Sequence, residues 1–184
     1  MAKIILFNMI SIDGYFEGPG RDISWHNVNE EFNEFAVEQL NSASALIFGR
    51  RTYELMVSYW PSEEALRDDP VVAGLMNSKP KIVFSKTMKR ADWTNTRVYN
   101  GNVEKVCLGL KAENVNDIYV FGSAELASDL ISMNLIDEFR FVINPVVLGS
   151  GVPIFRSSSG KRKMKLVRSA VFASGNVLVI YTPE

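Results

Sequence analysis

The stretch that decides the fold reads LIFGRRTYE at residues 46–54, and VFGSAEL at residues 120–126 repeats its pattern. In both stretches an apolar run typical of a buried strand ends at one glycine, and residues typical of a helix follow. Strands that alternate with helices in this way form parallel sheets with helices packed on their faces. The two stretches therefore predict an α/β fold in which two parallel strands end at a glycine.

The same alternation extends outward from these stretches through the whole chain. Apolar runs predict strands at residues 4–10, 45–48, 81–85, 97–99, 118–121 and 138–147, and a C-terminal hairpin of residues 165–172 and 177–182. Helical periodicity predicts helices at residues 30–40, 51–56, 63–76 with an interruption at Pro70, 103–111 and 126–133. We therefore expect one domain over residues 1–184, with three layers, a mostly parallel central sheet and an antiparallel C-terminal edge.

Composition narrows the classes of function. The chain has 184 residues, of which 47% are hydrophobic and 22% charged, with a net charge of −1. This balance gives no global reason to expect a nucleic-acid or membrane partner, so an anion site has to be local. One cysteine, Cys107, and one histidine are too few for a structural zinc site, and we expect no metal. The absence of cysteine pairs suits a cytoplasmic protein.

The first glycine junction has the parts of a phosphate site. Gly49 permits close approach of a ligand to the backbone, and the first N–H groups of the following helix are free to donate. Arg50, Arg51 and Thr52 add charged and hydroxyl donors at the same point. The alternative is a surface helix start that carries two solvated arginines.

The second junction repeats this arrangement with Gly122, Ser123 and Ala124. Taken alone, Ser123 could simply cap the helix without any ligand. The carboxyl ends of parallel strands lie at one rim of a sheet, however, and ligands of such sheets bind there. A pyrophosphate could therefore span the junctions at Gly49 and Gly122.

A third strand end adds Ser85 and Lys86. Together with Arg50 or Arg51, these donors could bind a 2′-phosphate and favour NADPH over NADH. The alternative is a plain turn with a solvated lysine. The chain lacks the G-x-G-x-x-G fingerprint of standard dinucleotide-binding folds, so that fold is not indicated.

An ordered set of short motifs resembles a known family. The motifs are SIDG at 11–14, GRRTYE at 49–54, VFSK at 83–86, VFGSA at 120–124, LIDEFR at 135–140, PVVLGSG at 145–151 and PIF at 153–155. From Lys3 to Tyr181 the chain resembles the dihydrofolate reductase superfamily. Within it, the chain is most similar to the bacterial reductase domain of riboflavin biosynthesis, the RibD C-terminal domain, and its stand-alone relatives.

The resemblance implies an NADPH-dependent oxidoreductase that binds a small molecule and forms a homodimer. It places Arg50, Arg51 and Thr52 on one phosphate region, and Ser85 and Lys86 near the 2′-phosphate. Gly122, Ser123 and Ala124 would lie at the pyrophosphate. The implied reaction is hydride transfer to a pyrimidine- or pterin-type compound, as in 5-amino-6-(5-phosphoribosylamino)uracil reductase, in which the cofactor carries the chemistry.

Two acids are candidates for catalysis. Asp13 leaves the first strand beside the expected nicotinamide position, and Glu31 on the first helix is nearest to the buried acid of dihydrofolate reductases. As alternatives, Asp13 could bond its own turn ahead of Gly14, and Glu31 could be a solvated helix charge. Trp25 could form a wall of the substrate cleft together with Asp13 and Gly14, or could be an ordinary packing residue. The neighbouring His26 could contact substrate, although a surface histidine is the simpler interpretation.

Two other functions remain open at this point. One is a dihydrofolate reductase-type activity. The Gly122-Ser123 pair argues against it, because dihydrofolate reductases usually carry two glycines there. The other is a nucleotide-binding dimer without catalysis, since the phosphate site has more support than any proton donor. A protein that kept only the fold is a third possibility.

Overall fold

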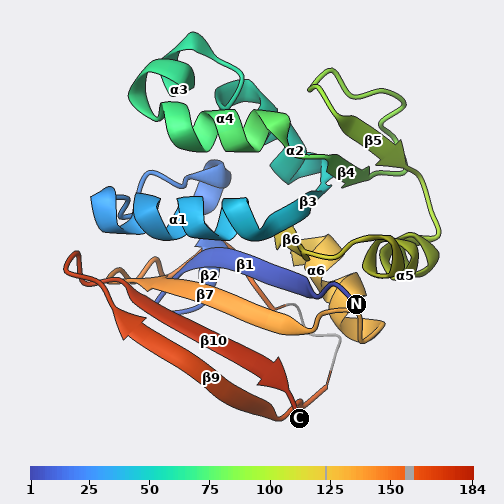
Figure 1. The fold of residues 1–184 in the computed structure, drawn as a ribbon. Helices are drawn as coiled ribbons and strands as arrows, with labels where there is room; N and C mark the ends of the chain where they lie inside the picture. Colours follow the sequence, from blue (N-terminus) through green and yellow to red (C-terminus); the bar gives the residue numbers. More distant parts are fainter. Residues whose placement is uncertain (123, 156–159) are drawn as a thin grey trace.

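The main feature of the computed structural model, which describes residues 1–122, 124–155 and 160–184, is an eight-stranded sheet (Figure 1). Its strand order is β5-β4-β3-β6-β1-β7-β10-β9. The strands are β1 (Ile4–Ser11), β3 (Ala43–Gly49), β4 (Lys81–Phe84), β5 (Thr96–Tyr99), β6 (Asp117–Phe121), β7 (Glu138–Asn144), β9 (Met164–Val171) and β10 (Val177–Pro183). The helices are η1 (Pro19–Arg21), α1 (Glu30–Ser42), α2 (Arg50–Tyr59), α3 (Glu63–Asp68), α4 (Pro70–Ser78), α5 (Val103–Glu113) and α6 (Ala124–Ser132).

Strand direction confirms the expected fold class. The six strands from β5 to β7 in the sheet order all pair in parallel, and β10 pairs antiparallel with both β7 and β9. The β9–β10 hairpin forms the edge of the sheet far from β5 (Figure 1). Because the parallel strands all run the same way, their carboxyl ends share one rim of the sheet and their amino ends share the other.

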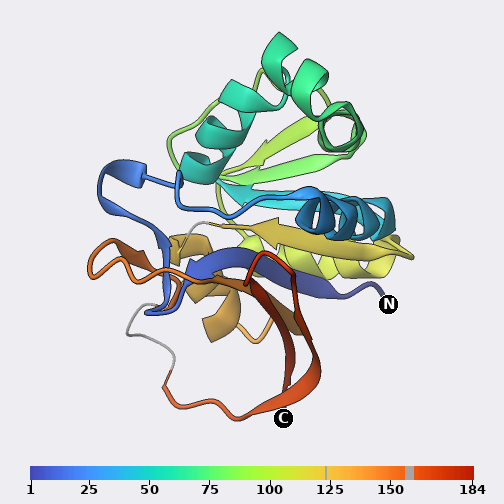
Figure 2. The ribbon, with the colours of Figure 1, turned by 90° about the vertical axis from the view of Figure 1, so that its left-hand side faces the viewer.

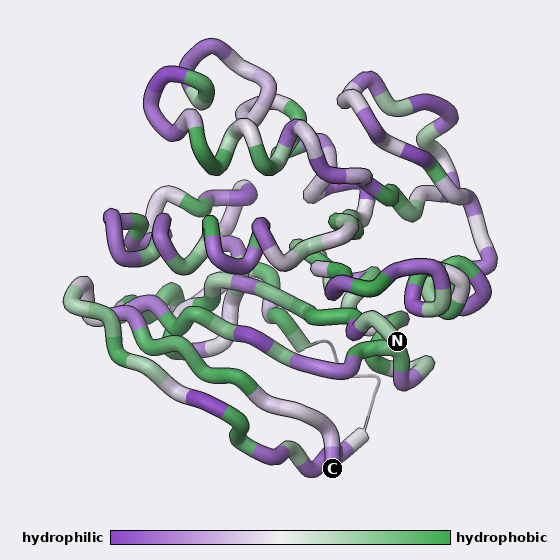
Figure 3. The backbone as a smooth tube through the Cα atoms, in the orientation of Figure 1, coloured by the Kyte–Doolittle hydropathy of each residue, from purple (hydrophilic) through white to green (hydrophobic). Residues whose placement is uncertain are grey.

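Apolar residues cover both faces of the sheet, which gives three layers. Ile4 and Leu6 of β1 pack into one core cluster, which includes Cys107 of α5 and Leu130 of α6. Ile5 of β1 packs into the other cluster, to which α1 and α4 contribute. Figure 2 shows helices on both sides of the sheet, and Figure 3 shows that the central strands are hydrophobic along most of their length. In the described part of the chain, no helix is long and apolar enough to cross a membrane.

Two elements differ from the sequence expectation. The strand predicted to run to Val147 ends at Asn144, because Pro145 has no N–H to continue the ladder. A short two-stranded ribbon, β2 (Tyr15–Glu17) with β8 (Val152–Pro153), was not predicted. This ribbon brings Phe16 and Glu17 to the carboxyl rim of the main sheet.

A polar network centred on the buried residues Glu138 and Tyr119 closes the amino rim of the sheet. Glu138 accepts from Arg140 Nε at 2.6 Å and from Lys3 Nζ at 3.2 Å. Arg140 also donates to the Tyr119 hydroxyl at 3.0 Å, and that hydroxyl lies 3.0 Å from Ser42 Oγ. Burial raises the pKa of Tyr119, so its hydroxyl stays neutral. The network ties β1, β6, β7 and α1 together.

Candidate functional site

A cavity of about 360 Å³ lies at the carboxyl ends of β3, β4 and β5. It is bordered by the first turns of α2 and α6 and by the β2–β8 ribbon. Its lining includes seven residues that the sequence predicted for a cofactor site: Gly49, Arg50, Arg51, Thr52, Ser85, Lys86 and Ala124. The predicted residues from three strand ends therefore border one cavity, which we call the rim cavity.

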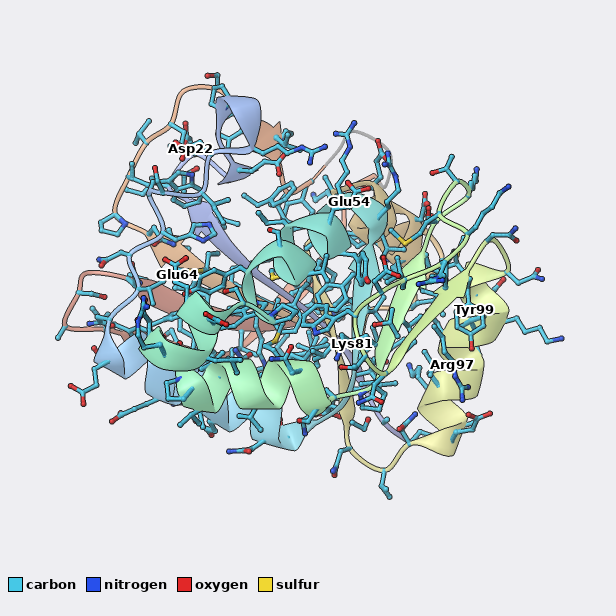
Figure 4. The ribbon with its side chains drawn as sticks, turned by 90° about the horizontal axis from the view of Figure 1, so that it is seen from above. Asp22, Glu54, Glu64, Lys81, Arg97 and Tyr99 are labelled. Atoms are coloured by element: carbon cyan, nitrogen blue, oxygen red, sulfur yellow. The ribbon has the colours of Figure 1, made fainter. Side chains whose placement is uncertain are left out.

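The start of α2 supplies donors to the rim cavity. Gly49 is the N-cap of this ten-residue helix, and no side chain caps it. The first N–H groups of a helix have no intrahelical acceptor, and the helix dipole favours an anion beside them. Arg50 is held by Glu54 on the next turn, at 2.9 Å (Glu54 is labelled in Figure 4). Within the described residues Arg51 makes no hydrogen bond or ion pair, so its guanidinium is available to a ligand.

The far end of the rim cavity combines a cation with aromatic rings. Ser85 Oγ accepts from the backbone N–H of Met88 at 2.9 Å, which forms a turn and leaves the hydroxyl proton free to donate. Lys86 follows in this turn and is exposed. Phe84 and Tyr99 line the same end with ring centroids 6.1 Å apart; Figure 4 shows Tyr99 at the end of β5.

Gly122, in the second glycine junction, packs closely against Thr52 of the first. It follows β6 with a φ of +60°, and a Cβ added there would lie 2.9 Å from the Thr52 side-chain oxygen. Because β3 and β6 are neighbouring parallel strands, Gly49 and Gly122 lie at the same rim, as the sequence predicted. The predicted site residue Ser123 lies outside the described residues.

A second cavity, of about 510 Å³, lies between the carboxyl ends of β1 and β6 and the helices α1 and α2. We call it the apolar cavity, because aliphatic and aromatic side chains form most of its lining. Its aromatic lining residues are Phe7, Phe16, Phe32, Tyr59, Trp60 and Phe121. The two cavities share four lining residues, Phe16, Glu17, Arg51 and Thr52, and Gly122 lines the apolar cavity. An elongated ligand could therefore lie in both.

Two polar side chains in the apolar cavity are unsatisfied. Asn8 on β1 is 6% exposed, and its Nδ2 has no hydrogen-bond partner among the described residues. His26 Nε2 is also buried, and it too has no partner within the described part of the chain. Burial lowers the pKa of His26 to about 4, against the opposing effects of a backbone hydrogen bond with Phe16 and of the Asp22 carboxylate. His26 is therefore a neutral cavity residue rather than the surface histidine that the sequence favoured.

The two acids predicted for catalysis, Asp13 and Glu31, lie outside both cavities and accept hydrogen bonds from the backbone of loops. The Asp13 carboxylate accepts from the backbone N–H groups of Leu148 at 3.1 Å and Gly149 at 2.8 Å. A hydrogen bond from Ser11, together with these backbone bonds, lowers the pKa of Asp13. Glu31 accepts from the backbone N–H of Ala173 at 2.7 Å, next to the β9–β10 turn. Neither carboxylate lines the rim cavity or the apolar cavity.

The other predicted substrate residues also lie outside both cavities. Trp25 donates from its ring nitrogen to the Asp22 carbonyl at 2.9 Å and packs edge-on against His26, with centroids 4.5 Å apart. Gly14 has a φ of +83°, and its carbonyl accepts from Ile154 N at 3.0 Å. Trp25 therefore supports a cavity residue, while Gly14 shapes the turn that leads into the β2–β8 ribbon.

Sequence reasoning missed several lining residues. Asn8 is a polar residue within an otherwise apolar strand, and this break in the pattern was a usable signal. Tyr99 and Trp60 had no such signal, because an aromatic residue near the end of an element is usually a packing residue. In the described residues, no group of three or more histidine, cysteine or acidic side chains could hold a metal ion.

Sequence comparison assigns the chain to a family. Residues 2–178 match the RibD C-terminal domain. The uncharacterized protein YyaP of Bacillus subtilis is 32% identical over 182 residues, which cover 97% of this chain and 94% of that protein.

Solved structures share the fold. A putative riboflavin biosynthesis protein from Shewanella superposes with a TM-score of 0.78 at 23% identity, over 100% of this chain and 99% of that one. The Thermotoga maritima deaminase/5-amino-6-(5-phosphoribosylamino)uracil reductase gives 0.70 at 17% identity, over 100% of this chain and 57% of that one. Enterococcus faecalis dihydrofolate reductase, complexed with NADP(H), gives 0.67 at 12% identity, over 99% and 96%. The solved structures show that the chain has the dihydrofolate reductase-like fold, and the match over residues 2–178 shows that it belongs to the RibD C-terminal domain family.

Proposed function

We propose that this protein is an NADPH-dependent reductase of a pyrimidine- or pterin-type small molecule. One observation carries the proposal. The rim cavity, which is rich in hydrogen-bond donors that can bind an anion, meets the apolar cavity at Arg51 and Thr52. A dinucleotide has a charged part and a neutral nicotinamide ring, and these two environments suit the two parts. The Thermotoga reductase and the NADP(H)-bound dihydrofolate reductase, which share the fold, support the same assignment.

The residues of the rim cavity fit the cofactor. The uncapped start of α2 and the unpaired Arg51 would hold the pyrophosphate, and the absence of a side chain at Gly122 lets Thr52 pack against the end of β6. Lys86 and the Ser85 hydroxyl would hold the 2′-phosphate, with Phe84 and Tyr99 beside the adenine. Gly49, Arg50, Thr52 and Ala124 complete the lining, with Arg50 oriented by its ion pair to Glu54.

The protein's own contribution to the reaction is orientation and a dry site. NADPH, when bound, would supply the hydride. The apolar cavity would hold the substrate ring against the nicotinamide and exclude water. Glu17 is the carboxyl group that lines both cavities, so it takes the place of Asp13 and Glu31 as our candidate to hold the transferred proton. Glu17→Gln should lower kcat without weakening the binding of NADPH, because it removes a negative charge and not a donor from the cofactor site.

Two measurements test the proposed function. NADPH should raise the melting temperature by mass action, and a spectrophotometric assay should show NADPH oxidation with 5-amino-6-(5-phosphoribosylamino)uracil or with dihydrofolate. A preference for dihydrofolate would favour the second candidate activity, which the likeness to dihydrofolate reductase supports. Binding of NADPH without turnover of any pyrimidine or pterin would favour a nucleotide-binding protein, and no binding would refute the proposal.

We also propose that a second copy of the chain covers the edge strand β9. An edge strand presents unpaired backbone groups, and β9 exposes Leu166, Val167 and Val171 by 51%, 56% and 75%. A homodimer would cover these apolar side chains. Light scattering after size exclusion should give the dimer mass, and Val167→Lys should shift it to the monomer mass.

A further inference from the structure

The apolar cavity contains polar groups that the free protein does not use. Asn8 is nine-tenths buried on a central strand, yet its Nδ2 donor lacks a partner among the residues described. Buried polar groups are nearly always hydrogen-bonded, because an unpaired one destabilises the fold. A leucine of similar size would avoid this cost on an otherwise apolar strand. The asparagine therefore needs a reason outside the free protein's own stability.

His26 presents the opposite kind of group to the same cavity. The backbone of Phe16 raises the pKa of the His26 ring, as a carbonyl beside a ring N–H does, and Nε2 has no partner in the described part of the molecule. We therefore assign the ring proton to Nδ1. A neutral ring with its proton on Nδ1 carries a lone pair on Nε2. The cavity therefore offers one donor, from Asn8, and one acceptor, from His26.

We propose that Asn8 and His26 anchor the ring of the substrate, and that this ring is an uncharged planar heterocycle with a carbonyl or ring-nitrogen acceptor for Asn8 and an N–H donor for His26. This inference rests on the proposed function, whose cofactor lies mainly in the rim cavity. Both residues line the apolar cavity, and neither lines the rim cavity. Hydroxypyrimidine and pterin rings in their keto forms carry both kinds of group.

The charges of the apolar cavity also favour an uncharged ring. Its cations are Arg21 and Arg51, its anions are Glu17 and Asp69, and His26 is neutral, so the charges of its lining balance. Arg51 is shared with the rim cavity, where the cofactor phosphates would engage it. A hydrogen-bonded, aromatic-walled cavity of this kind discriminates ligands by shape and by donor–acceptor pattern rather than by charge.

The experiment uses the fused pyrimidine lumazine as probe, with 1,3-dimethyllumazine as its match. The two rings have the same carbonyl groups, but methylation removes the N–H donors. With the protein saturated by NADP⁺, calorimetry should show that lumazine binds roughly three- to tenfold more tightly than the dimethyl compound. In His26→Phe this preference should disappear, and in Asn8→Leu both compounds should lose affinity by a similar factor.

Two controls separate this inference from the proposed function and from a structural role. Asn8→Leu should keep or raise the melting temperature of the free protein, because it removes an unpaired buried donor, and it should leave the NADPH affinity unchanged. Equal binding of the two lumazines to the wild-type protein would overturn the role of His26 without any variant. A lower melting temperature in Asn8→Leu would identify a structural asparagine. Weaker NADPH binding in that variant would assign Asn8 to the cofactor, and both results would overturn its assignment to substrate.

Discussion

The two rims of the sheet use polar residues in opposite ways. At the amino rim, Glu138 and Arg140 are half-buried or buried, and each has more than one hydrogen-bond partner. At the carboxyl rim, Asn8 and the partly buried His26 each have a buried nitrogen without a partner among the described residues, and within the same part of the chain the exposed Arg51 is unpaired. The strands that end at both rims are the same, so the difference lies in the residues that each rim carries.

The difference shows which polar residues of one sheet stabilise the fold and which are available to bind a ligand. A saturated polar network stabilises the fold and leaves nothing for a ligand. Unsatisfied donors, positive-φ glycines and uncapped helix starts weaken the free protein, but a ligand can satisfy them. We therefore expect changes at the amino rim to alter the free energy of unfolding, and changes at the carboxyl rim to alter mainly ligand affinity.

The largest expected effect is at the amino rim. Glu138→Ala should lower the free energy of unfolding by about 3–5 kcal/mol, because it leaves Arg140 partly buried without its carboxylate. Urea denaturation measures this loss, and the dissociation constant of NADPH should stay the same. The matched control is Asp68→Ala, which breaks the exposed Arg67–Asp68 pair and should change stability by at most about 1 kcal/mol. Comparable losses in the two variants would show that the amino-rim network adds no special stability.

The second effect concerns pH at the carboxyl rim. The folded-state pKa of His26 is about 4, below its ordinary value of 6.5, so the unfolded chain binds a proton that the folded protein excludes. Stability should be fully present above pH 6.5 and should fall by up to about 3 kcal/mol as the pH drops to 4. His26→Phe should make this dependence shallower. Because His26 is the only histidine, the pH dependence of its ring NMR signal gives its pKa directly. A pKa near 6.5 would contradict the lowered pKa and the burial of the ring.

The third effect tests the glycine junction. Gly122→Ala should lower stability by about 1–2 kcal/mol, because its φ of +60° disfavours a side chain and the new Cβ would crowd Thr52. The same change should weaken NADPH binding, which calorimetry measures. Gly101→Ala is the control: Gly101 also lines the rim cavity, but no atom lies within 4 Å of its added Cβ. If both variants lost NADPH affinity equally, the tight contact between the two junctions would have no special role.

The smallest effect concerns cofactor selectivity. Arg51→Ala combined with Lys86→Ala should weaken NADPH by roughly tenfold or more and NADH by less, because Arg51 would hold the pyrophosphate of both cofactors while Lys86 would hold the 2′-phosphate that only NADPH carries. Arg50→Ala should weaken NADPH less than Arg51→Ala, since Arg50 is already engaged by Glu54. Fluorescence titration with both cofactors measures the ratio. An equal loss for NADPH and NADH would remove the 2′-phosphate assignment.

Most of the fold could be predicted from the sequence, because its signals are local. The predicted strand at residues 4–10 is β1, and the predicted break at Pro70 separates α3 from α4. Residues 145–147 were predicted as strand because Val146 and Val147 are β-formers, but Pro145 stops the ladder. The β2–β8 ribbon was missed because strands of two or three residues carry no period.

The candidate site could be predicted only in part. Gly49, Arg51 and Lys86 were found because strand ends and helix starts bring their chemistry to one rim. Asp13 was expected in the substrate cleft, but its carboxylate binds the Leu148–Gly149 backbone, a partner 135 residues away in the sequence. Lys81, near the centre of Figure 4, is a second residue whose surroundings could not be predicted, because it is only 1% exposed. Its ammonium group donates to three backbone carbonyls, and burial lowers its pKa to about 8. Such long-range or buried contacts have no local signature.

The most direct test of the account is an amide NMR titration of the protein with NADPH. The proposed cofactor site predicts that the largest shifts occur at the carboxyl rim, at Gly49, Arg51, Ser85, Lys86 and Gly122, while the amides around Glu138 stay unchanged. Shifts confined to the amino rim, or the absence of any shift at saturating NADPH, would contradict the claim that these strand ends bind one dinucleotide together.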